Sequence, residues 1–149
     1  MTPAGKPLFI DTNVLIFANV REAAHHEHAL GRIKECKAAG CDFWVSAQVL
    51  REFLAVRSRT DLFREPGSPS VLQERIRYSR SRFRVATDSD AVIDKLLMLL
   101  GQVQVSGKQV HDANIVATMI VHDIRHLLTD NVDDFRRFER FVEVVPLVE

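Results

Sequence analysis

Short apolar segments alternate with longer amphipathic segments along the chain. The apolar, β-prone runs of strand length lie at residues 8–10, 43–45, 83–86, 126–129 and 141–145. Helical spacing of apolar residues occurs at residues 23–39, 46–56, 70–80, 91–100 and 110–121. Strands that alternate with helices in this way predict an α/β fold, in which a mainly parallel central sheet is flanked by helices.

Local signals support the boundaries of these segments. Ser46 precedes one helical segment and is a favourable N-cap, while Gly40 and Gly101 follow two others, as is typical of helix ends. We interpret residues 11–13 (DTN) as a polar turn that ends the first strand. Residues 57–70 are polar and include Pro-Gly-Ser-Pro, which predicts a loop within one domain.

Composition indicates an ordinary globular domain. The 149 residues are 46% hydrophobic and 27% charged, and the formal net charge is zero. The charge is unevenly distributed, because residues 51–84 contain nine Arg and no Lys against four acidic residues. Arg suits bidentate contact with phosphate, although a solvated surface with local ion pairs explains the same pattern. The candidate phosphate-binding residues are Arg51, Arg57, Arg59 and Arg64.

The sequence gives no sign of a membrane or secreted protein. The first ten residues lack the long apolar core of a signal peptide, and runs such as residues 96–100 are far too short to span a bilayer. Cys36 and Cys41 are the two cysteines, too few for a disulfide framework or a zinc motif. We therefore expect reduced thiols and a cytoplasmic location.

Acidic residues follow two of the predicted strands. Asp11 comes directly after the first strand, and Asp130 and Asp134 follow the strand at 126–129. Asp112 lies at the start of a helix, and Glu52 lies within an apolar helical segment. In parallel sheets ligands bind beyond the carboxyl ends of the strands, and several carboxylates together favour Mg²⁺ or Mn²⁺. Taken singly, each acid could instead be a helix cap, a turn residue or a surface ion-pair partner.

Four motifs, in this order along the chain, favour a shared metal site over these separate roles. They are DTNVL at residues 11–15, VLREF at 49–53, VHDA at 110–113 and LLTDNVDDF at 127–135. Together they resemble the PIN-domain ribonucleases, and most closely the VapC-type toxins of bacterial toxin–antitoxin pairs. The resemblance implies a three-layer PIN-like fold that forms a single domain over residues 1–149. It also implies an endoribonuclease that is the toxin of a type II pair.

The resemblance also assigns roles to individual residues. It implies that Asp11, Glu52 and Asp112 hold the divalent metal and that Asp134 is the fourth acid. The implied supporting residues are Asn13, Thr129 and Asn131, while Asp130 fills a position that the family pattern leaves variable. A metal held by these acids, Mg²⁺ or Mn²⁺, can activate water for attack on a phosphodiester without a protein nucleophile. The implied partners are RNA, a cognate antitoxin and a second copy of the chain.

Two other functions compete with this interpretation. In a haloacid-dehalogenase-like phosphatase, Asp11 would be the nucleophile and the loop at 130–134 would bind the metal. Asn13 argues against this, because that chemistry needs a second carboxylate two positions after the nucleophile. A catalytically inactive PIN module that only binds RNA or an antitoxin would be expected to lack one of the metal-binding acids, and all candidates are present here.

Overall fold

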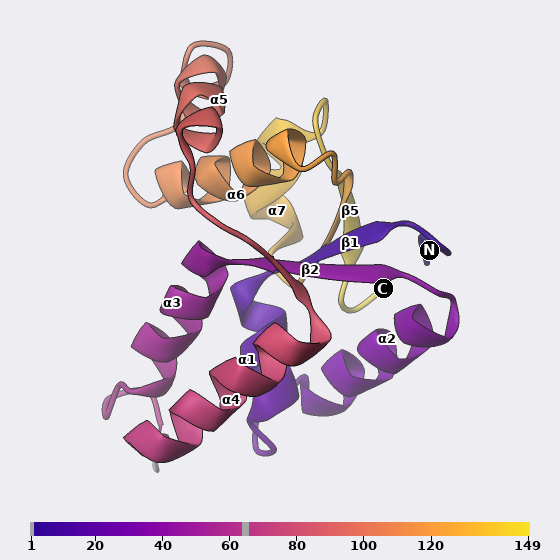
Figure 1. Ribbon diagram of the computed structural model, residues 1–149, viewed down its shortest axis with the longest axis vertical. Coiled ribbons are helices and arrows are strands. Elements are labelled where there is room, and N and C mark those ends of the chain that lie inside the picture. The colour runs from indigo at the N-terminus through magenta and orange to yellow at the C-terminus, as the bar shows by residue number, and fades with distance from the viewer. Residues whose placement is uncertain (1, 64–65) are drawn as a thin grey trace.

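The computed structural model describes residues 2–63 and 66–149 and has a fully parallel five-stranded sheet at its centre (Figure 1). The strand order is β3-β2-β1-β4-β5, and each neighbouring pair is parallel. The strands are β1 (Pro7–Ile10), β2 (Asp42–Ser46), β3 (Arg84–Ala86), β4 (His126–Thr129) and β5 (Glu143–Pro146). The predicted parallel α/β sheet is therefore confirmed.

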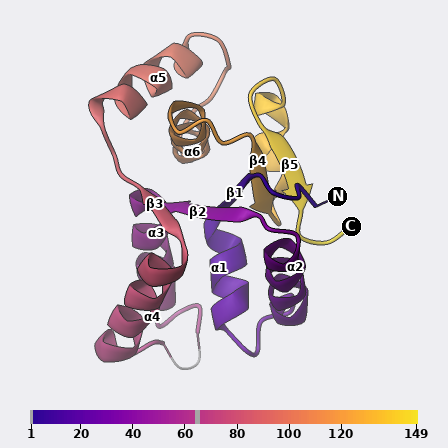
Figure 2. The ribbon, with the colours of Figure 1, turned by 45° about the vertical axis from the view of Figure 1, so that its right-hand side comes forward.

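Helices cover both faces of the sheet and complete three layers (Figure 2). One face carries α1 (Thr12–Asn19), α2 (His26–Ala38), α3 (Ala47–Arg57) and α4 (Pro69–Arg82). The other carries α5 (Asp90–Leu100) and α6 (Gln109–Val121), while the short α7 (Val132–Phe135) and a 3₁₀ turn, η1 (Arg136–Phe138), connect β4 to β5. Among these described helices, none combines the length and apolar character that crossing a membrane requires.

The core is built from the central strands. Leu8, Phe9 and Ile10 of β1 and Leu127 and Leu128 of β4 are all fully buried. Strands that are covered by helices on both faces are apolar on successive residues, which is why these segments show no alternation of polar and apolar side chains. The two strands are paired in parallel, so the residues that follow them lie at the same edge of the sheet.

The interpretation of residues 11–13 as a polar turn is wrong for Thr12 and Asn13, which belong to α1. Asp11 is the N-cap of this helix, and its carboxylate accepts a hydrogen bond from the backbone N–H of Thr12. The helix has only eight residues and a mostly apolar sequence, TNVLIFAN. Such a short segment lacks the polar face that makes helical periodicity visible in a sequence.

Two other predicted boundaries also shift. The helix expected from residue 23 begins at His26, and the last strand, expected at 141–145, is found at Glu143–Pro146. The backbone N–H groups of Phe141 and Val142 both donate to the carbonyl of Phe138. These residues therefore close a turn after η1 instead of joining the sheet, although Val142 is buried as its apolar character suggested.

The strand order creates a switch point between β1 and β4. The chain leaves β1 toward β2 and β3 on one side, whereas β4 lies on the other side of β1 and leads on to β5. The backbone N–H of Asp11 donates to the carbonyl of Leu128 at 3.0 Å, so the ends of the two strands are joined. Crevices at such switch points are the usual ligand sites of open parallel sheets.

Candidate active site

Asp11 lies at the centre of a hydrogen-bond network where β1 and β4 end. Its carboxylate is buried, with 6% of the residue exposed. Oδ1 accepts a hydrogen bond of 2.8 Å from the backbone N–H of Thr12. Oδ2 accepts one of 2.7 Å from the Thr129 hydroxyl and one of 3.1 Å from the Asn13 amide. Burial raises the pKa of Asp11, although these three hydrogen bonds favour its ionised form.

Asn13 and Thr129 extend the network into the loop after β4. The Asn13 amide also donates to Thr129 Oγ1 at 3.2 Å, and Asn13 Oδ1 accepts a bond of 3.0 Å from the backbone N–H of Asp130. The backbone N–H of Asn131 donates to Thr129 Oγ1 at 3.0 Å. Of the four supporting residues, Asn13 and Thr129 thus contribute side chains, whereas Asp130 and Asn131 contribute backbone N–H groups.

Glu52 lies on α3 and is half-buried. Its Oε1 atom is buried and has no hydrogen-bond partner among the described residues. Burial raises the pKa of Glu52, the nearby Gln48 side chain lowers it, and the charge of Asp11 raises it again. The alternative that Glu52 is a surface ion-pair partner of a neighbouring arginine on α3 is not what is observed. Arg51 Nη2 lies 3.0 Å from Asp88 Oδ2, and Arg57 stacks 4.5 Å above the ring of Phe63. The Glu52 carboxylate therefore belongs to the acidic group.

Asp112 lies in the first turn of α6, whose N-cap is Lys108. Its pKa is raised to about 7, chiefly by burial and then by the charges of Asp134, Asp11 and Glu52, while Arg137 opposes the rise. Four carboxylates from separate parts of the sequence therefore share one electrostatic neighbourhood. Like charges gathered in this way are costly unless a cation or a proton compensates for them.

Asp134 completes the group from α7. Its side chain is exposed, and its charge raises the pKa values of both Asp11 and Asp112. The backbone N–H of Asp134 donates to the carbonyl of Asn131 at 3.2 Å, which sets the turn that brings this residue back toward the sheet. The structure thus places the four predicted acids around the carboxyl edge of β1 and β4.

The chemistry of the site suits a hard divalent cation. All four acidic side chains offer oxygen atoms, the donors that Mg²⁺ and Mn²⁺ prefer, and the buried Glu52 Oε1 has no partner within residues 2–63 and 66–149. In the same ranges, no three His, Cys, Asp or Glu side chains stand as a group that could hold a metal ion. The residues present therefore fit a divalent ion by donor type, by charge and by this unsatisfied oxygen, although the carboxylates as they stand are not drawn together into a ligand group.

Three residues near the acids are not evident from the sequence. Gln48 is buried on α3, one helical turn before Glu52, and its amide accepts a bond of 2.7 Å from Asn114 on α6. Arg137 on η1 lowers the pKa of Asp112 electrostatically. The one sequence signal that these amides lie near the acids is their spacing, because Gln48 precedes Glu52 by four residues and Asn114 follows Asp112 by two. That spacing does not reveal that the amides meet.

The candidate phosphate-binding arginines lie on and after α3. Arg51 is exposed beside the acidic group and pairs with Asp88. Arg59 lies in an exposed loop and forms a two-point ion pair with Asp61, one bond of which is 2.9 Å from Nε to Oδ1. Arg64 lies outside the described residues. Of this set, Arg51 is the one whose charge lowers the pKa of Glu52.

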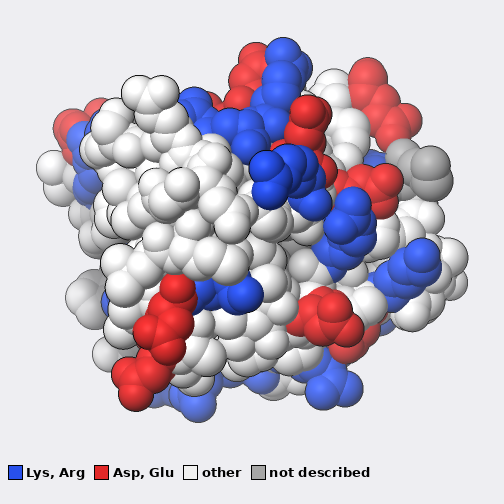
Figure 3. Space-filling model, turned by 90° about the horizontal axis from the view of Figure 1, so that it is seen from above, with Lys and Arg blue, Asp and Glu red and all other residues white. Residues whose placement is uncertain are grey.

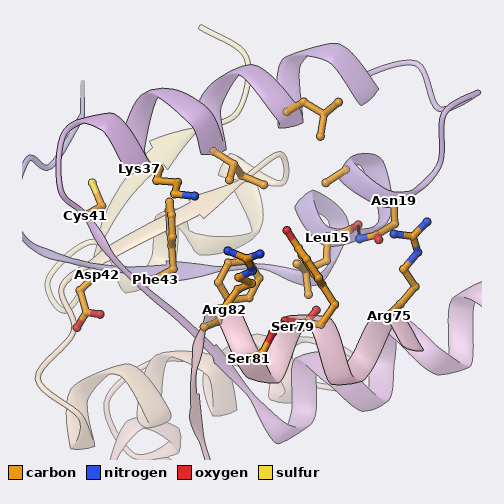
Figure 4. A pocket seen from close by; sticks show the side chains of 15 residues that line it. Leu15, Asn19, Lys37, Cys41, Asp42, Phe43, Arg75, Ser79, Ser81 and Arg82 are labelled. Atoms are coloured by element: carbon orange, nitrogen blue, oxygen red, sulfur yellow. Dashed lines mark hydrogen bonds between the residues drawn. The ribbon is translucent and has the colours of Figure 1, made fainter. Parts of the chain in front are cut away.

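A groove of about 650 Å³ lies apart from the acids (Figure 4). It lies between α2 and α4, with α1 and the start of β2 behind it, and none of the four acidic residues lines it. Leu15, Leu30 and Ile33 provide apolar lining, and Lys37, Arg75 and Arg82 bring positive charge. A mixed apolar and cationic groove is suited to an amphipathic segment that carries acidic residues.

Comparisons with known proteins agree with this geometry. The family model described as PIN domain matches residues 8–140. Ribonuclease VapC24 of Mycobacterium tuberculosis is 26% identical over 132 residues, which cover 88% of this chain and 90% of that protein. The structure of VapBC2 from Rickettsia felis, bound to a DNA fragment from its promoter, has a TM-score of 0.68 at 17% identity, covering 93% of this chain and 98% of the other.

Another solved structure of similar fold is VapC20 of Mycobacterium tuberculosis, described as a sarcin-ricin loop cleaving toxin. Its TM-score is 0.60 at 18% identity, over 80% of this chain and 86% of that chain. The likeness to the solved structures establishes the fold, and the family model spans most of the sequence and all four acids. The chain therefore belongs to the PIN-domain family.

Proposed function

We propose that this protein is a divalent-metal-dependent endoribonuclease that acts as the toxin of a type II toxin–antitoxin pair. The observation that carries the proposal is that four acids lie together at the carboxyl edge of the sheet: Asp11, Glu52, Asp112 and Asp134. For the first three, the negative charge of at least one other member of this group raises the pKa. The matched relatives named as ribonuclease and as toxin support the same activity.

Each residue has a distinct part in this proposal. Asp11 and Asp112 would hold the ion, with Glu52 and Asp134 completing the ligands. When bound, a divalent ion supplies a Lewis acid that activates water and neutralises charge on the phosphate. Thr129 and Asn13 fix the orientation of the Asp11 carboxylate through bonds of 2.7 and 3.1 Å. The carboxylates already repel one another in the metal-free protein, so binding of a cation would relieve that repulsion.

The phosphatase alternative is disfavoured by the surroundings of Asp11. Asn13, at the position where that chemistry requires an acid, donates its amide to Asp11 instead. An inactive binding module is disfavoured because none of the four acids is replaced.

The groove between α2 and α4 supports an antitoxin partner. We propose that an amphipathic segment of the antitoxin lies there, with apolar side chains against Leu30 and Ile33 and acidic ones near Arg75 and Arg82. The solved toxin–antitoxin complex from Klebsiella pneumoniae, which shares the fold at a TM-score of 0.63, supports the proposal of such a partner. RNA would be bound on the side of the acids, with Arg51 at its edge.

The outer face of α5 supports self-association. Ile93, Leu97 and Leu100 follow the i, i+4, i+7 spacing of one helix face and are 53%, 61% and 40% exposed. Figure 3 views the molecule from above, the end at which α5 lies in Figure 1. It shows a wide surface without Lys, Arg, Asp or Glu, bordered by side chains of both charges. We propose that a second copy covers this face in a homodimer of single-domain chains located in the cytoplasm.

A digestion assay tests the proposed activity. Purified protein is incubated with a panel of short structured and unstructured RNAs in Mg²⁺, in Mn²⁺ and in EDTA. Cleavage that requires the ion, and that falls by more than about 100-fold in Asp11→Asn and Asp112→Asn, is the expected result. Glu139→Gln, an exposed acid outside the group, is the matched control and should cleave normally. Undiminished cleavage in EDTA would exclude the mechanism.

A further inference from the structure

Two buried amides join the helices that carry Glu52 and Asp112. Gln48 of α3 is 5% exposed, and its Nε2 donates a bond of 3.0 Å to the carbonyl of His111 at the start of α6. Its Oε1 accepts a bond of 2.7 Å from the Asn114 amide of the same helix. One side chain of α3 therefore holds α6 at two points, one residue before Asp112 and two residues after it.

Among the described residues, the side-chain hydrogen bonds that join α3 to α6 are these two bonds of Gln48. The N-cap of α6, Lys108, makes no side-chain capping bond. The main helical neighbour of α6 is α5, whereas α3 packs chiefly on α1 and β2. Asp112 and Glu52 also repel each other, since the charge of Glu52 is one of those acting on Asp112. The two hydrogen bonds from Gln48 to α6, which we call the Gln48 clamp, oppose this repulsion. They lie next to both acids, because Gln48 is one helical turn before Glu52 and its partners flank Asp112.

We infer that Gln48 and Asn114 are positioning residues that set the separation of the Glu52 and Asp112 carboxylates. They thereby determine the affinity for the divalent ion without touching the ion or the RNA. This inference rests on the proposed function, because it concerns the same ion. Partners that orient metal ligands from outside the ligand shell commonly change metal affinity by about 10-fold to 100-fold.

The first test measures ion affinity in the absence of RNA. Mn²⁺ is titrated calorimetrically into the unchanged protein and into the variants Gln48→Leu and Asn114→Leu. Each variant replaces an amide with an apolar side chain of similar size. We expect the Kd for Mn²⁺ to rise about 10-fold to 100-fold in both variants. Gln73→Leu, an exposed glutamine on α4, is the matched control and should bind Mn²⁺ as the unchanged protein does. Unaltered affinity in folded variants would overturn the inference.

The second test separates positioning from general damage. Gln48→Asn shortens one amide by a methylene, and Asn114→Gln lengthens the other by the same amount. The double variant should regain most of the Mn²⁺ affinity that Gln48→Asn loses, which a nonspecific packing defect would not do. Failure of this rescue would overturn the inference, and the pair remains informative if Gln48→Leu does not fold.

Kinetics provide a further distinction. At saturating Mn²⁺ the variants should recover a kcat within about threefold of the unchanged protein, with the KM for RNA unaffected, because only ion binding is weakened. A kcat that stays low at saturating Mn²⁺ would overturn the inference. If the unchanged protein neither binds Mn²⁺ nor cleaves RNA, the proposed function fails. If it does both and the variants match it, only the role of the clamp fails.

Discussion

The hydroxyl of Thr129 donates a 2.7 Å hydrogen bond to Oδ2 of Asp11, a residue 118 positions earlier in the chain. This bond joins the end of β4 to the end of β1 at the switch point of the sheet. Both residues are buried, at 0% and 6% exposed, so water does not compete for the bond. The position of Asp11 is therefore set by the sheet and not by a flexible loop.

Replacing Thr129 by valine should weaken both stability and activity. Thr129→Val keeps the shape of the side chain but removes the hydroxyl, which leaves Asp11 without one donor and the Asn131 N–H without its acceptor. Unfolding in urea should show a loss of about 1–3 kcal/mol, the cost of leaving buried polar groups unsatisfied. Thr129→Ser retains the hydroxyl and is expected to lose less than half as much. Equal losses would mean that packing, and not this bond, matters.

Asp112 should make the metal-free protein less stable as the pH rises. Its pKa is about 7 in the folded chain against 3.8 for an ordinary Asp, so the folded state holds a proton that the unfolded state has released. Stability is therefore greatest below the lower value and is lost as the pH rises toward 7. We expect the Tm in EDTA to be higher at pH 5.5 than at pH 8. The difference should shrink in Asp112→Asn, and an unchanged difference would contradict the assignment.

Removing the charge of Asp134 should stabilise the protein while impairing the proposed site. Its charge raises the pKa values of Asp11 and Asp112, so Asp134→Asn relieves repulsion in the metal-free state. We expect a higher Tm in EDTA together with weaker Mn²⁺ binding and slower RNA cleavage. Asp133→Asn is the adjacent control, since Asp133 is exposed and pairs with Arg136 at 2.6 Å. Its effect on Mn²⁺ affinity should be negligible.

The sequence predicted the sheet well because its central strands are continuous apolar runs. Residues 8–10 and 126–129 are apolar throughout, and a parallel sheet buried on both faces requires that pattern. It also indicated where the acids would gather, since Asp11 directly follows a strand. Helix α1 was not predicted, because an eight-residue apolar helix has no polar face to show a period.

The neighbours of the acids could not be predicted in the same way. Gln48 and Asn114 meet only because α3 and α6 are brought together across 66 positions of sequence. A buried glutamine on an amphipathic helix has the same local pattern as an exposed one. The sequence also left open whether Glu52 would be a surface ion-pair partner, and in the structure the neighbouring Arg51 pairs with Asp88 instead. Such choices depend on tertiary contacts and have no local signal.

The apolar face of α5 predicts a change in oligomeric state on charge insertion. Leu97 is 61% exposed at the middle of the stripe formed with Ile93 and Leu100. Leu97→Glu places a charge there and should convert a dimer into a monomer, as measured by light scattering coupled to size exclusion. Val71→Glu is the matched control, because Val71 of α4 is also apolar and 48% exposed but lies outside the stripe. A dimer that survives Leu97→Glu would place the interface elsewhere.

Arg51 and Arg59 should differ in their contribution to RNA binding. Arg51 lies beside the acids and pairs with Asp88 at the surface, an interaction of small energy that a phosphate can replace. Arg59 is held by Asp61 in an exposed loop. Binding of a fluorescent single-stranded RNA is measured against salt in an Asp112→Asn background, which keeps the RNA intact. Arg51→Gln should reduce the slope of log K against log salt by about 0.7, one phosphate contact, and Arg59→Gln should leave it unchanged. Equal slopes for both variants would assign Arg51 to the solvated surface.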